Sequence, residues 1–229
     1  MVIFAVVMFP FADYISTFQL ILKGLLIGII CSAPMGPVGI LCIRRTLQKG
    51  REYGIATGAG AALSDLFYAL VTGAGMLPLM MEFIDKEQNL FYLKIVGAIM
   101  LFAFGIWMLR TDPRKGYRPS QSENNGTLFS NAVSAFFLTI SNPLIIFLFI
   151  ALFNMFTFVI PGNWYGSALG YASIVGGAML WWMGLTQLIV RMKSKFDLHG
   201  IKTLNRTIGT IVITVAVLYA AMTIFHLSL

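Results

Sequence analysis

Six long apolar stretches run through this chain, and they restrict its possible folds more than any other feature. They lie at roughly residues 18–43, 53–79, 90–109, 128–155, 165–190 and 205–227. Each is long enough for a helix to cross ~30 Å of hydrocarbon, which takes about 20 residues. Lipid offers the backbone no hydrogen-bonding partners, so such stretches must be helical, and the alternation typical of a membrane β-barrel is absent. The sequence therefore predicts an all-α membrane protein with six transmembrane helices.

Charge predicts how these helices are oriented. Only 11% of the 229 residues are charged, yet the net charge is +7, and most basic residues follow the first, third and fifth apolar stretches. Basic residues favour the cytoplasmic side of a membrane, so these three loops should be cytoplasmic and both termini extracytoplasmic. The chain has no soluble module to bind nucleic acid. A bacterial inner membrane is therefore the simplest location for it.

Three landmarks recur in the two halves of the chain, in the same order and at a nearly constant separation. A proline break, a Tyr-Gly-x-x-x-Gly motif and a basic-x-x-Gly motif begin at Ser32, Tyr53 and Lys94, and again at Ser141, Tyr165 and Arg206. Each half holds three predicted spans, so the second half would be inverted relative to the first, as in many secondary transporters. We predict an N-terminal extension (1–17), a first three-helix repeat (18–111), a cytoplasmic linker (112–127) and a second three-helix repeat (128–229).

Proline interrupts the first and fourth predicted helices. The breaks contain Pro34, Gly36 and Pro37 in the first helix and Ser141, Asn142 and Pro143 in the fourth. Proline removes a backbone donor and clashes with the preceding turn, so neither helix can be regular there. A half-helix that begins at such a break offers free N–H groups to an anion such as a carboxylate. Because the break recurs in both halves, the sequence favours a substrate site between the breaks over simple kinks.

Asp65 is the one acid predicted to lie deep inside a span, near the middle of the second helix. A charged group there costs about 2.5–3.5 kcal/mol on insertion scales. It is expected to face the bundle interior or a water-filled path, where it could exchange a proton or hold a substrate ammonium group. The alternative is a structural carboxyl that is bonded to Ser64, Tyr68 or a helix break. We favour the functional interpretation, because ionisable residues inside membranes usually mark sites.

Glycines at close helical spacing mark the second and fifth predicted helices. Small residues at such positions let neighbouring helices approach closely. We interpret them as packing residues rather than ligand contacts: Gly54, Gly58, Gly60, Gly166 and Gly170.

Together these motifs resemble the LysE/RhtB amino-acid exporter family, over about residues 20–227. The matching elements are Ser-Ala-Pro34-Met-Gly36-Pro37-Val-Gly, the glycines up to Asp65, and Asn142-Pro143. The resemblance implies a compact six-helix fold of two inverted repeats. It also implies export of amino acids or related small metabolites from the cytoplasm, driven by the proton-motive force. Leu144 departs from the family pattern, in which a lysine frequently follows the Asn-Pro element.

Two other functions remain open from the sequence. An exporter of divalent metal cations could use Asp65, Cys31 and Cys42, and a membrane thiol–disulfide electron carrier would need both cysteines. No phosphate loop, metal-ligand cluster or nucleophile–base pair is present, so we predict a transporter without cofactor, resident metal or enzymatic activity. The expected partners are a small-molecule substrate, a proton or another coupling ion, and the lipid bilayer, and a homo-oligomer is a further option that the sequence leaves open.

Overall fold

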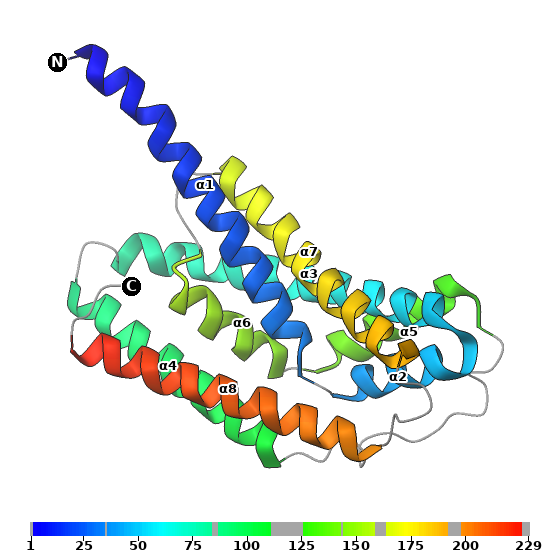
Figure 1. Ribbon diagram of the computed structural model, residues 1–229. Coiled ribbons are helices and arrows are strands. Elements are labelled where there is room, and N and C mark those ends of the chain that lie inside the picture. The colour runs from blue at the N-terminus through cyan, green and yellow to red at the C-terminus, as the bar shows by residue number, and fades with distance from the viewer. Residues whose placement is uncertain are drawn as a thin grey trace.

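A computed structural model describes residues 2–34, 36–83, 87–110, 126–142, 144–158, 164–191 and 198–225. These residues form eight α-helices (Figure 1): α1 (Val2–Ser32), α2 (Pro37–Lys49), α3 (Arg51–Phe83), α4 (Glu87–Arg110), α5 (Leu128–Ile140), α6 (Leu144–Met155), α7 (Trp164–Arg191) and α8 (Leu198–Ile224). Most of the predicted linker lies outside the described residues. The predicted N-terminal extension is not a separate element, because from Val2 onward its residues form the first part of α1.

Four of these helices are long and apolar enough to cross a membrane, namely α3, α4, α7 and α8. The pairs α1–α2 and α5–α6 meet the same test together, and they bend by 82° and 76° at their breaks. If each bent pair counts as one span, the described residues supply six. The prediction of an all-helical multi-pass membrane protein is confirmed at this level.

The break between α1 and α2 follows from its glycine and prolines. Helix α1 ends as the Ala33 N–H donates to Ile29 O at 2.9 Å, and the Gly36 N–H then donates to Pro34 O at 2.9 Å in a tight turn. Gly36 is extended and stands before α2, which begins with Pro37. Proline suits this first position because its missing N–H would have had no partner there.

Ser141 and Asn142 form hydrogen bonds at the break between α5 and α6. The Ser141 hydroxyl donates back to Phe137 O at 2.7 Å. The Asn142 carbonyl accepts from the Ile145 N–H at 3.3 Å as α6 begins. Pro143, between the two helices, lies outside the described residues. These bonds engage backbone groups that the break would otherwise leave open in a membrane.

The most extensive helix contacts join the two halves of the chain. Helix α1 packs along α7, α3 along α5 and α7, and α4 along α8. Figure 1 shows α1 and α7 side by side, with α4 and α8 as a separate pair that reaches the other helices mainly through α6. The two halves are therefore interlocked rather than stacked as separate bodies.

Backbone contact at glycine makes two of these pairs possible. A Cβ at Gly28 of α1 would overlap the Ile174 carbonyl of α7, and one at Gly60 of α3 would overlap the Ala132 carbonyl of α5. At other glycines assigned to packing, an added Cβ would meet Thr46 and Thr186 at Gly54, Trp182 at Gly58, and Phe158 and Leu20 at Gly170. Gly166 is buried in α7.

Candidate functional site

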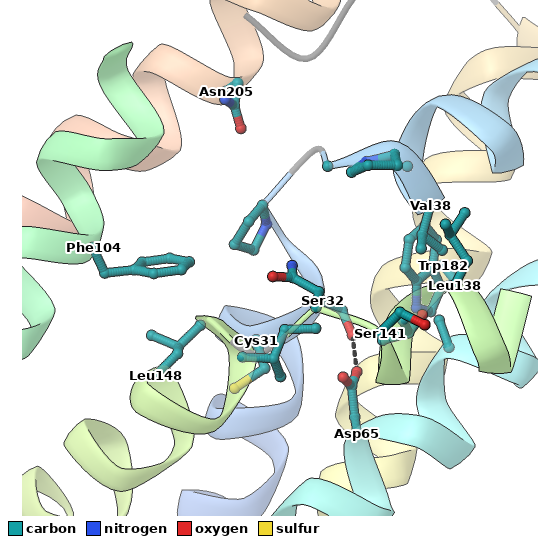
Figure 2. Close-up of a pocket in the computed structure, with 18 of the residues that line it drawn as sticks. Cys31, Ser32, Val38, Asp65, Phe104, Leu138, Ser141, Leu148, Trp182 and Asn205 are labelled. Carbon is teal, nitrogen blue, oxygen red and sulfur yellow. Dashed lines mark hydrogen bonds between the residues drawn. The ribbon is translucent and has the colours of Figure 1, made fainter. Parts of the chain in front are cut away.

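A cavity of about 380 Å³ lies where the two helix breaks meet α3. It is lined by the predicted binding residues Pro34, Gly36 and Pro37 from the first break, Ser141 and Asn142 from the second, and Asp65 from α3. Pro143 is the one predicted binding residue that lies outside the described part of the chain. Residues that are far apart in the sequence thus surround one space (Figure 2).

Asp65 is buried in the wall of this cavity, with 3% of its surface exposed. Its Oδ2 accepts a hydrogen bond of 3.0 Å from the Ser32 hydroxyl, drawn as a dashed line in Figure 2. Ser32 is the last residue of α1, so this bond ties the first break to α3. The sequence suggests Ser64, Tyr68 or a helix break as the partner of Asp65, and the observed partner, Ser32, lies at a helix break. The Ser64 hydroxyl has no partner among the described residues.

Tyr68 holds the second break from the same face of α3, about one helical turn from Asp65. Its hydroxyl donates to Ile140 O at 2.6 Å and also lies 3.2 Å from Asn142 O. A single turn of α3 therefore contacts both breaks, one through the carboxyl of Asp65 and one through the hydroxyl of Tyr68. A shift of this turn would be transmitted to both.

Trp182 of α7 closes another side of the cavity. Its ring lies against Gly58 of α3, where an added Cβ would meet the Trp182 Cβ and leave no room for both. The buried indole N–H has no acceptor within the described residues.

The family model of the LysE type translocators matches residues 29–223, which include both breaks and Asp65. The chain belongs to this family. It is therefore a multi-pass membrane translocator, and the resemblance found in its motifs is confirmed. The chain is also 25% identical over 145 residues to the uncharacterized membrane protein YahN of Escherichia coli (strain K12). That match covers 63% of this chain and 63% of YahN. No solved structure matches the chain significantly.

Arg45 of this LysE type translocator is one of the basic residues that follow the first apolar stretch, where the charge pattern predicts a loop. The structure places it in α2 instead, buried, with 6% of its surface exposed. The guanidinium donates to Thr57 Oγ1 at 3.1 Å, Asn131 O at 2.9 Å and Ser134 Oγ at 2.9 Å, and so joins α2 to α3 and α5. The available signal was helical spacing, which places Arg45 on the same face as the apolar Leu41 and Cys42.

The two cysteines of the translocator lie in different surroundings. Cys31 lines the cavity. Cys42 lies beyond the bend, in α2, where its thiol donates to Gly54 O at 3.4 Å. Both are free and buried. No group of three or more His, Cys, Asp or Glu that could hold a metal ion occurs in the described part of the chain.

Tyr68→Phe is expected to slow export by the translocator several-fold. The change keeps the ring and removes the hydroxyl that bonds Ile140 O at the second break. Loss of one such bond should also cost about 1 kcal/mol of stability. The test compares initial efflux rates and melting in detergent with Tyr92→Phe, whose side chain is exposed on α4. Equal rates for the two variants would show that the Tyr68 bond has no part in transport.

Proposed function

We propose that this translocator exports amino acids or related small metabolites from the cytoplasm by proton antiport. One observation carries the proposal: Asp65, the only charged residue among those described around the cavity, lies between the two helix breaks. Among the described residues, the Ser32 hydroxyl donates to this buried carboxylate, which leaves it a suitable partner for one positive charge. That charge would be either a substrate ammonium group or a proton.

The substrate carboxylate would meet the start of α2. The first N–H groups of a helix have no partner within it, and they carry the positive end of the helix dipole. Pro37 has no N–H, so the first donors are those of Val38 and Gly39, both of which line the cavity. Leu144 stands where the family pattern frequently has a lysine, which could pair with a substrate carboxylate. In this chain the backbone N–H groups of α2 would bind the carboxylate instead.

The fluxes of substrate and proton would be coupled because only one of them can occupy Asp65 at a time. One carboxylate can neutralise a proton or an ammonium group, but not both at once. Release of the substrate outside would therefore free Asp65 to take up a proton, which leaves on the cytoplasmic side when the next substrate binds. Such exchange requires that the cavity open to each side in turn.

An inverted repeat would supply two similar states for this exchange. The pairs α1–α7 and α5–α3 are those that such a repeat would interchange, and both are extensive. The paired breaks support the same arrangement. Helices α2, α4 and α7 also carry Lys49, Arg110 and Arg191 in their last turns. These cations favour cytoplasmic ends for the three helices, in a bacterial inner membrane with extracytoplasmic termini.

The proposal is tested with cells loaded with labelled amino acids or, separately, with divalent metals. Export of an amino acid that needs the protein, and that stops when a protonophore collapses the proton gradient, is the expected result. Export of a metal alone would contradict the proposal and favour the cation exporter. Amino-acid export that the protonophore leaves unchanged would remove the proton from the mechanism and retain the substrate class.

A further inference from the structure

We infer that the cavity selects an amino acid with a bulky apolar side chain, and that Phe104 of α4 is the residue that recognises this side chain. The inference rests on the proposed function and narrows its substrate class. Figure 2 shows Phe104 and Leu148 directed into the cavity from the side opposite Trp182, with Asp65 and Ser32 between them in the wall.

The charge of the cavity lining argues against basic and acidic amino acids as substrates. Among the described lining residues, only Asp65 carries a charge. The second cation of lysine or arginine would find no carboxylate there, and the second carboxylate of glutamate would find no cationic side chain. An unpaired charge in a water-poor site is strongly unfavourable. The substrate should therefore carry one ammonium and one carboxylate group.

The hydroxyls around the cavity are already used as donors inside the protein. Ser32 donates to Asp65, Thr139 to Ala135 O at 2.9 Å and Ser141 to Phe137 O at 2.7 Å. Asn142 and Asn205 also bring side-chain amides to the cavity, and the Asn205 amide donates to Met108 O at 3.1 Å. The backbone N–H groups at the start of α2 are donors that no bond within the helix uses. These suit one carboxylate. A substrate with a polar side chain would exchange its hydration for groups that are already engaged.

An apolar wall faces this polar region. Phe104 and Trp107 of α4 have ring centroids 5.6 Å apart, and Ile145 and Leu148 of α6 complete the wall. A volume of about 380 Å³ is at the small end of the range for ligand sites, and suits a single amino acid. Each methylene buried here should raise affinity about fourfold. Leucine should therefore be preferred to alanine by at least tenfold.

The first test uses the purified full chain in proteoliposomes, with labelled leucine, phenylalanine, alanine, threonine, lysine and glutamate loaded in turn. We expect leucine or phenylalanine efflux at least tenfold faster than alanine efflux at equal low concentration, with lysine and glutamate at background. If threonine or lysine leaves as fast as leucine, the inference is wrong and the proposed function stands. If no amino acid leaves, both fail.

The second test assigns the selectivity to a residue. Phe104→Ala should lower the leucine-to-alanine ratio to threefold or less, whereas Phe104→Leu should retain most of it. Phe102→Ala is the matched control, because Phe102 lies on the same helix, is 40% exposed and does not line the cavity. A wild-type ratio in Phe104→Ala would overturn the role of Phe104. If that variant does not fold, Phe104→Thr takes its place, and a wild-type ratio in Phe104→Thr would do the same.

Discussion

Asp65→Asn is expected to reduce export to the background of cells that lack the protein. The amide keeps the size of the carboxyl and can still accept the Ser32 hydrogen bond, but it neither binds a proton nor neutralises an ammonium group. The fold should therefore survive while coupling is lost. The measurements are initial efflux rates, the amount of protein in the membrane and the melting temperature in detergent.

Ser64→Ala provides the matched control for this prediction. Ser64 is the neighbour of Asp65 on α3, is equally buried, and has a hydroxyl with no partner in the described region. Its loss should leave both stability and export unchanged. Asp65→Glu should retain part of the activity, because the charge is kept and displaced. Export at the wild-type rate by Asp65→Asn would exclude the carboxyl from coupling and would leave the proposed antiport without a proton carrier.

Gly60→Ala should cause the largest loss of stability among single-methyl changes in α3. The new Cβ would overlap the Ala132 carbonyl of α5, and a backbone oxygen cannot move aside as a flexible side chain can. Helices α3 and α5 would have to separate, which should strain the bonds from Arg45 to Thr57 and Ser134. Overpacking of this kind costs about 3 kcal/mol, which is equivalent to roughly 6–12 °C in melting temperature for a chain of this size.

Gly75→Ala, on the same helix, separates overpacking from the general effect of removing a glycine. A Cβ at Gly75 would meet nothing within 4 Å. Alanine is the better helix former, so this variant should melt at the wild-type temperature or slightly above it. Both variants are purified in the same detergent and melted side by side. Equal melting temperatures would show that the α3–α5 contact tolerates a wider spacing.

Much of this architecture could be predicted because lipid leaves the backbone few choices. Apolar length alone located the spans, and proline together with glycine located both breaks. The burial of Asp65 followed from its position within an apolar stretch. The angles of the breaks, 82° and 76°, could not be predicted, because proline interrupts a helix but packing decides where the chain then turns.

The partners of the site residues could not be read from the sequence. Ser32 is 33 residues from Asp65, and nothing local indicates that the two side chains meet. Arg45 stands beside Arg44 at the end of an apolar stretch, a pattern typical of cations that reach out to lipid headgroups. It is buried because α5, which comes much later in the chain, supplies acceptors for it. The sequence does not distinguish Phe104 from the other apolar residues of its stretch. Only the position of α4 in the fold brings it to the cavity.

The interlocked packing also has a consequence for how the chain is made. Helix α1 leaves the ribosome well before its main neighbour, α7, which begins only at Trp164. Arg45 likewise must wait for Asn131 and Ser134 before its hydrogen bonds can form. During synthesis the surface of α1 at Gly28 and the cation of Arg45 therefore stay without their native partners for a time. The native contacts of α1 can form only after α7 has been made.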